Sequence, residues 1–136
     1  MTDEELIREA FKAREKSYCP YSGFAVGAAL LCKNGKVYRG CNIENAAFSP
    51  TNCAERTAFF KAVSEGDTEF SRIAIVGGDV SKPVDGYAYP CGVCRQVMME
   101  FCNPDSFEII VAKSFDEYSI FTLKELFPNG FGPDNL

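Results

Sequence analysis

The chain has 136 residues, enough for one domain (residues 1–136) with one hydrophobic core, and it carries 14 basic and 19 acidic side chains but no histidine. A formal charge of −5 with no basic stripe would repel a phosphate backbone, which argues against a nucleic-acid partner. No stretch is apolar enough to span a membrane, and seven cysteines behind a charged N-terminal segment without an apolar leader predict reduced thiols in a cytoplasmic setting.

The N-terminal third predicts a helix followed by a hairpin. Thr2-Asp3-Glu4-Glu5 is a capping box that opens a helix extending to about Ser17. Two apolar runs, Phe24 to Cys32 and Val37 to Cys41, are predicted strands. Asn34-Gly35 between them favours a tight turn, so the two strands should pair antiparallel.

The middle of the chain predicts a second helix and a buried strand. Asn52 is placed to cap a helix from Cys53 to Glu65 that ends at Gly66. The apolar run Arg72 to Val76 is typical of a buried strand, and Gly77 to Pro90 is predicted to be a long loop.

The C-terminal part predicts a helix, two strands and a short last helix. The helix covers Cys91 to Phe101, and the strands cover Phe107 to Ala112 and Tyr118 to Phe121. Thr122 to Glu125 is a second capping box, before a helix that ends at Pro128. Alternating helices and strands of this kind favour an α/β fold, with a mixed five-stranded sheet covered by helices on both faces.

Two short motifs carry three thiols and one carboxylate. Cys53-Ala54-Glu55 is followed 38 positions later by Cys91-Gly92-Val93-Cys94. A zinc ion held by these three cysteines would keep its fourth tetrahedral position open for water, as hydrolytic zinc sites do. Glu55 is then placed to take a proton from that water. Both motifs lie at predicted helix starts, where the helix dipole favours thiolates.

Arg56 offers a balance for the charge of this centre. Three thiolates leave a zinc site with a formal charge of −1, which makes a bound water less acidic. A guanidinium donating to the sulfurs would offset that charge. The alternatives are that Arg56 is an exposed helical arginine and that Glu55 is only the capping-box partner of Asn52.

Other uses of these cysteines remain open at this point. A C-x-x-C at a helix start also builds redox dithiols, but that leaves the Cys53 motif without a role. A closed structural zinc site with Cys41 or Cys102 as fourth ligand is a second alternative, which leaves Glu55 unused. The cysteines outside the motifs, Cys19, Cys32, Cys41 and Cys102, are otherwise expected to be core residues.

Three blocks together resemble a known family. These are Gly40 to Ala46, Cys53 to Ala58, and Pro90 to Gln96, and with their spacing they resemble the small cytidine deaminases of nucleoside salvage from about Tyr18 to Phe131. The resemblance implies a three-layer α/β/α sandwich and a zinc-dependent enzyme, with one zinc per chain, that hydrolyses cytidine and 2'-deoxycytidine to uridine or 2'-deoxyuridine and ammonia. In the family the counterpart of Arg56 donates to the zinc thiolates.

The resemblance also implies a nucleoside pocket. The counterpart of Phe24 packs on the pyrimidine, and those of Asn42 and Glu44 bind the ribose 3'-hydroxyl. The backbone N–H of Ala54 is expected to meet the base. Taken without the family, Phe24 would be a core residue. Glu44 would oppose a phosphate by charge, so the pocket should favour nucleosides over nucleotides.

Family members are homotetramers whose pockets are completed by neighbouring subunits. Phe131 matches a C-terminal aromatic residue that reaches into a neighbour's site. Phe48 stands where relatives often have tyrosine, and the Asp79 to Tyr89 loop is long, so its path near the pocket is open. Two rival functions are deamination of a modified, blasticidin-type cytosine nucleoside and a non-catalytic, zinc-stabilised binding module.

Overall fold

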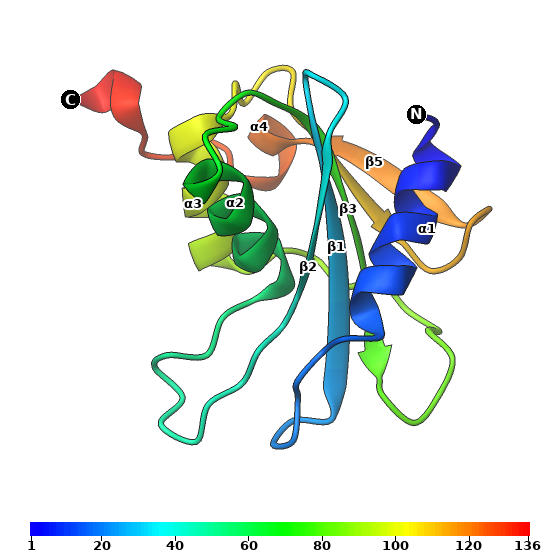
Figure 1. The fold of residues 1–136 in the computed structure, drawn as a ribbon. Coiled ribbons are helices and arrows are strands. Elements are labelled where there is room, and N and C mark those ends of the chain that lie inside the picture. The colour runs from blue at the N-terminus through cyan, green and yellow to red at the C-terminus, as the bar shows by residue number, and fades with distance from the viewer.

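The computed structural model describes residues 1–136 and contains one five-stranded sheet between two layers of helices (Figure 1). The strand order is β2-β1-β3-β4-β5, in which only β3 and β4 run parallel. The predicted three-layer α/β/α arrangement with a mixed sheet is therefore confirmed. The elements are α1 (Asp3–Arg14), β1 (Phe24–Cys32), β2 (Val37–Cys41), α2 (Ala54–Ser64), β3 (Phe70–Asp79), α3 (Gly92–Phe101), β4 (Glu108–Ala112), β5 (Tyr118–Thr122), α4 (Leu123–Leu126) and a 3-10 turn, Pro133–Asn135.

Strand β1 is buried on both faces, which explains its nearly continuous apolar sequence. Because side chains alternate along a strand, Ala28 and Leu30 face the core under α2 and α3. Ala29 and Leu31 face the opposite core under α1. The sheet is therefore covered on both sides, with α1 alone on one face (Figure 1).

Two predicted elements differ from the structure by three residues at one end, and the others differ by no more than two. The first helix ends at Arg14, not near Ser17. Strand β3 is longer than the predicted Arg72 to Val76, because Gly77, Gly78 and Asp79 continue its pairing with the start of β1. The two glycines concealed this extension, since glycine is depleted in strands and marks loops.

The predicted cap of α2 is wrong, whereas both predicted capping boxes are confirmed. Cys53, not Asn52, is the N-cap of α2, and the Asn52 amide donates instead to the Thr57 hydroxyl at 3.2 Å. Thr2 and Thr122 cap α1 and α4 through complete capping boxes.

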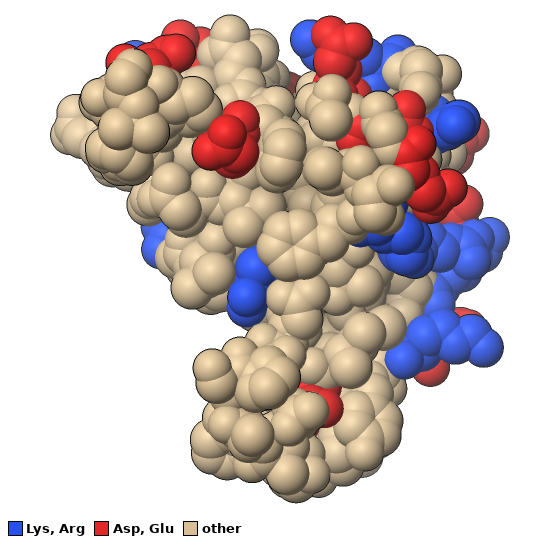
Figure 2. Space-filling model, turned by 60° about the vertical axis from the view of Figure 1, so that its left-hand side comes forward, with Lys and Arg blue, Asp and Glu red and all other residues tan.

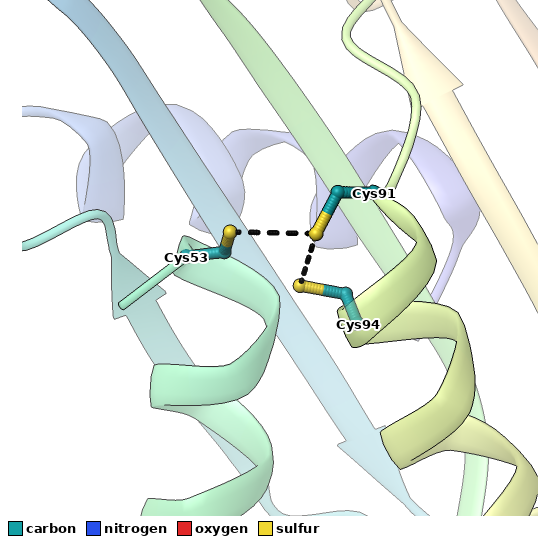
Figure 3. A group of neighbouring side chains, drawn as sticks. All are labelled: Cys53, Cys91 and Cys94. Carbon is teal, nitrogen blue, oxygen red and sulfur yellow. Dashed lines mark hydrogen bonds between the residues drawn. The ribbon is translucent and has the colours of Figure 1, made fainter. Parts of the chain in front are cut away.

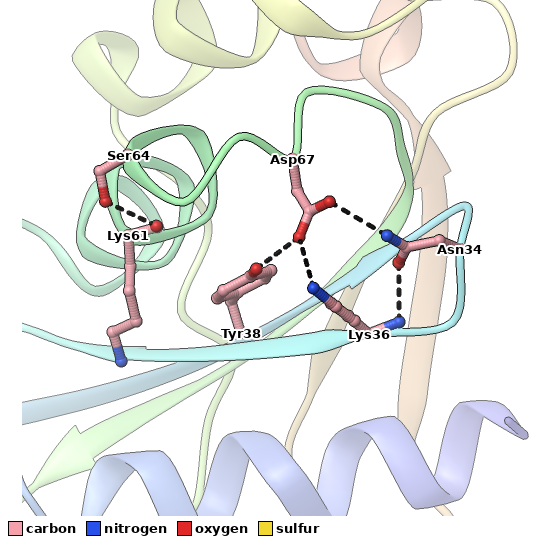
Figure 4. A network of polar contacts seen from close by, with 6 residues as sticks. All are labelled: Asn34, Lys36, Tyr38, Lys61, Ser64 and Asp67. Carbon is pink, nitrogen blue, oxygen red and sulfur yellow. Dashed lines mark hydrogen bonds and ion pairs between the residues drawn. The ribbon is translucent and has the colours of Figure 1, made fainter.

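A polar network fastens the β1–β2 hairpin to the connection between α2 and β3 (Figure 4). The Asp67 carboxylate accepts from the Asn34 amide at 3.0 Å and from the Tyr38 hydroxyl, and it lies 3.7 Å from the Lys36 ammonium. The hydrogen bond from Tyr38 lowers the pKa of Asp67, and the same bond raises the pKa of Tyr38 to about 12. This network lies at the end of the sheet where α2 finishes.

Three connections gather at the opposite end of the sheet, where α2 and α3 begin (Figure 1). They are residues 15–23, 42–53 and 80–91. None of the helices has the length and apolar character that crossing a bilayer requires.

Candidate active site

The three motif cysteines converge between the starts of α2 and α3 (Figure 3). The Cys53 and Cys91 sulfurs are 3.7 Å apart, those of Cys91 and Cys94 are 3.6 Å apart, and all three lie within 4.8 Å of one another. A disulfide would need about 2.05 Å. Tetrahedral zinc with Zn–S bonds of about 2.3 Å sets its sulfurs about 3.8 Å apart. The donor set and its spacing therefore fit a zinc ion.

The thiols are positioned by the N-terminal ends of α2 and α3. Cys53 and Cys91 are the N-caps of α2 and α3, and neither makes a side-chain capping bond. Gly40 in β2 lets α2 approach closely, since a Cβ at this position would lie 2.2 Å from the Ala54 carbonyl oxygen. The first turn of α2 therefore rests directly on the sheet backbone.

Arg56 lies against the thiol cluster. Its Nη2 donates to the Cys53 sulfur at 3.2 Å. The pKa of the Cys53 thiol is lowered, because the neighbouring Cys94 thiol and the guanidinium of Arg56 favour its thiolate form. The pKa of Cys94 is raised, chiefly by the neighbouring Cys53 sulfur and by burial. The alternative of a freely exposed helical arginine is thus wrong.

Glu55 is the one charged side chain among the buried residues, and only 4% of it is exposed. Burial in the low-dielectric interior disfavours its charged form and raises its pKa to about 7. A carboxyl group with a pKa near neutrality can both accept and donate a proton at physiological pH. Since Asn52 is not the N-cap, a capping-box role for Glu55 is wrong.

Neither a redox dithiol nor a closed zinc site fits the geometry of the cysteines. A redox dithiol needs two thiols, but Cys53 lies as close to Cys91 as Cys94 does. Neither Cys41 nor Cys102 belongs to the cluster. The Cys41 thiol donates to the Lys16 carbonyl oxygen instead. The cluster is therefore open on its fourth side as far as protein ligands are concerned.

Cys53 and Cys91 of this cluster line a cavity of about 510 Å³. The residues predicted for the site that line this cavity are Phe24, Asn42, Glu44, Cys53, Ala54, Glu55 and Cys91. The predicted side chains are thus brought together, with the thiols and Glu55 beside one another. Phe24 is 45% exposed and not part of the core.

Asn42 and Glu44 are held in place by hydrogen bonds to the segment before β1 and to β1 itself. The Asn42 side chain accepts from Val26 N at 2.9 Å and donates to the Phe24 carbonyl at 2.7 Å. Glu44 accepts from the Ser22 hydroxyl and from the N–H groups of Tyr21 and Ser22. Its pKa is lowered, chiefly by the Ser22 hydroxyl, so Glu44 is ionised.

Phe131 does not line this cavity. It is 56% exposed on the C-terminal tail, where its carbonyl accepts from the Gln96 amide at 2.8 Å. Within one chain it is therefore separate from the other predicted site residues.

Several residues that line the cavity are not predicted by the sequence motifs. Tyr89 and Ala88 could have been found from their position just before the Pro90-Cys91 motif. The others gave no signal, because their side chains meet the cavity only through strand register and loop path: Ser22, Val26, Thr51, Asn52 and Ile75.

Residues 1–108 match the family model described as the cytidine and deoxycytidylate deaminase zinc-binding region. The chain belongs to this deaminase family. The match and the cluster of three thiols together make zinc the cofactor of this family member.

Named members of the deaminase family are similar over their full length. A protein named cytidine deaminase from Sporosarcina psychrophila is 50% identical over 136 residues, which cover 100% of this chain and 96% of the relative. One of the same name from Halalkalibacterium halodurans is 48% identical, with 100% and 98% covered.

Crystal structures of family members share the fold. The cytidine deaminase of Burkholderia pseudomallei matches with a TM-score of 0.87 and 44% identity, covering 96% of this chain and 100% of that one. The Mycobacterium tuberculosis enzyme matches with a TM-score of 0.81 and 34% identity, covering 97% and 99%.

Proposed function

We propose that this chain catalyses the hydrolytic deamination of cytidine and 2'-deoxycytidine to uridine and 2'-deoxyuridine plus ammonia, as a step of pyrimidine salvage. One observation carries the proposal: a single cavity is lined by two thiols of the three-cysteine cluster, by the buried carboxyl group of Glu55, and by the side chains of Asn42 and Glu44, which hydrogen bonds hold in place. The names of the full-length relatives support it.

Cys53, Cys91 and Cys94 would hold the zinc ion. When bound, zinc supplies a Lewis acid that makes water acidic enough to attack C4 of the pyrimidine at neutral pH. Arg56 donates to the Cys53 sulfur and offsets negative charge that would oppose this acidity.

Glu55 moves the protons of the reaction. It accepts one proton from the attacking water and delivers it to N3, and it then takes the proton of the new C4 hydroxyl group and passes it to the departing amine. In the balance, a C4–O bond forms, the C4–N4 bond breaks, and water is consumed as ammonia leaves. A buried carboxyl group with a pKa about 7 suits both directions of transfer.

The rest of the cavity would bind the nucleoside. The Phe24 ring would pack on the pyrimidine, the Ala54 N–H at the start of α2 would face the base, and Asn42 with Glu44 would bind the ribose 3'-hydroxyl. Because Glu44 is ionised, a phosphate beside it would be repelled.

The decisive assay is the fall in ultraviolet absorbance as cytidine becomes uridine, with ammonia measured in parallel. Zinc-loaded protein should release one ammonia per uridine formed. A protein that holds one zinc per chain but turns over neither cytidine nor 2'-deoxycytidine would leave only the binding-module alternative. Turnover confined to blasticidin-type nucleosides would favour that rival substrate.

We also propose a homotetramer with pockets completed across subunits. Phe131 is exposed outside its own cavity, and Phe48 is 73% exposed. In the view of Figure 2, most of the visible Lys and Arg side chains lie on the right-hand side of the molecule. The part of the molecule that projects downward in this view carries few charged side chains. Seven free cysteines further support a reducing, cytoplasmic setting.

Subunit mixing tests the shared pocket. Inactive Glu55→Gln chains mixed with Phe131→Ala chains should regain activity at low substrate, since some mixed pockets combine an intact Glu55 with an intact Phe131. Verified mixed tetramers without recovery, or a fully active monomer, would exclude a shared site.

A further inference from the structure

One wall of the cavity is the end of the long segment that joins β3 to α3. Ala88 and Tyr89 line the cavity from this segment. The Tyr89 ring lies 6.0 Å, between centroids, from the Phe121 ring on β5. Cys91 follows directly after Pro90. The same stretch of chain therefore supplies both a wall of the cavity and a thiol of the cluster.

This wall rests on β3 at Gly77, where the sheet has no side chain. Gly77 is the cross-strand partner of Val26. Because Ile75, two residues earlier, lines the cavity, a side chain at position 77 would point to the same face of the sheet.

The space above Gly77 is already filled by cavity-lining groups. A Cβ built there would lie 2.8 Å from the Ala88 Cβ, 3.1 Å from a Val26 methyl carbon and 3.2 Å from a Phe24 ring carbon. Gly77 is not among the residues with positive φ, so its backbone conformation does not demand glycine. Position 77 requires glycine because the side chains of Ala88, Val26 and Phe24 approach it so closely.

We infer that Gly77 is a positioning residue that sets the spacing between Phe24 and the Ala88–Tyr89 wall, and thereby the fit of the pocket around the pyrimidine ring. The inference rests on the proposed deaminase function for the identity of that ring. The Ala88 methyl is attached directly to the backbone and cannot rotate away. An added methyl at position 77 must therefore move the chain at Ala88, or the ring of Phe24.

The test compares Gly77→Ala with Gly78→Ala. Both variants change a glycine of β3 to alanine, so they share any effect of strand propensity. A Cβ at Gly78 would meet nothing closer than Val84 at 3.6 Å, which is ordinary contact. The measurements are kcat and KM for cytidine, the Kd of the product uridine by calorimetry, zinc per chain, and the thermal midpoint.

Gly77→Ala should raise KM and the uridine Kd about tenfold or more, with a smaller change in kcat, since displacement of a pocket wall by a fraction of an ångström weakens substrate positioning. Gly78→Ala should stay within about twofold of wild type for both constants, because its Cβ displaces no cavity-lining group. The inference would be overturned if Gly77→Ala had the KM and the uridine Kd of the wild type. It would also be overturned if both variants showed the same increase in these two constants.

A compensating change keeps the test valid even if Gly77→Ala folds poorly. The double variant Gly77→Ala with Ala88→Gly moves the methyl from the wall to the strand and removes the 2.8 Å contact. It should recover most of the lost uridine affinity and folding. No recovery in the double variant would overturn the inference.

The two proposals fail in different ways. Wild-type protein that binds uridine but does not turn over cytidine overturns the proposed reaction, and the role of Gly77 is then judged on uridine binding. Normal turnover with an unaffected Gly77→Ala variant overturns only the positioning role. A wild-type chain that neither turns over cytidine nor binds uridine overturns both.

Discussion

Replacing Glu55 with glutamine should remove most of the turnover while making the metal-free protein more stable. Glutamine has the same shape, so the buried site is not left with a cavity. It cannot carry a proton between water, N3 and the amine. Loss of a general acid–base group costs about 10²- to 10⁴-fold in rate, and we expect at least the lower figure because Glu55 acts in more than one step.

The stability change follows from burial. Raising the pKa of Glu55 from 4.5 to about 7 corresponds to up to about 3 kcal/mol. The folded wild type binds this proton more tightly than the unfolded chain does, so its stability falls as the pH rises from about 4.5 to 7. Glutamine removes that loss. The variant should therefore match the metal-free wild type near pH 4 and exceed it near pH 8.

Three measurements check this reasoning together. The absorbance assay gives kcat, metal analysis shows whether zinc is retained, and urea unfolding of the metal-free proteins at the two pH values gives the stability difference. Near-normal kcat in a zinc-loaded variant would remove Glu55 from the proton transfers. Equal free energies of unfolding of the two proteins at pH 8 would show that ionisation of the buried Glu55 does not destabilise the folded wild type.

The remaining predictions concern the metal, its charge, the shared pocket and the distant network. Cys91→Ala should lose most of its zinc and lower the thermal midpoint by several degrees or more, at roughly 4 °C per kcal/mol for this chain length; a chelator should lower the midpoint of the wild type but not of the variant. Arg56→Gln should keep zinc, lose about 10- to 100-fold in activity at neutral pH and shift the pH–rate profile upward, and an unchanged profile would contradict the charge argument. Phe131→Ala should raise KM with little change in the thermal midpoint; an unchanged KM would separate the tail from the pocket. Asp67→Asn should lower the thermal midpoint at pH 7, and because the pKa of Asp67 is lowered by Tyr38, the gap to wild type should close as the pH falls below about 4; a gap that persists in acid would exclude the ionised network as its cause.

The chemistry of the site could be predicted from sequence because it is concentrated in short motifs. Cys53 and Glu55 stand two residues apart, and Cys91 and Cys94 three apart, so their types and spacing are visible without a fold. The sequence also predicts that the two motifs meet in space, because three thiols complete the protein ligands of one open zinc site only when both motifs contribute.

What the sequence did not reveal depends on contacts between distant segments. The intrinsic preference of asparagine predicts Asn52 as the cap of α2, but the helix begins one residue later and Cys53 is its N-cap. β3 extends through Gly77 because it pairs there with β1, and Ala88 packs against Gly77. No local sequence pattern indicates either of these contacts. The pocket walls therefore required the structure, whereas the reactive groups did not.

The uncapped helix starts have a consequence for protein engineering. Thr2 and Thr122 give α1 and α4 complete caps, whereas α2 and α3 begin at cysteines that cap nothing. Serine or aspartate at Cys53 or Cys91 would add about 1 kcal/mol per helix in the metal-free protein. A redesign guided by thermostability alone would therefore replace these two cysteines. The replacement would remove zinc ligands, and the protein would lose both zinc binding and catalytic activity.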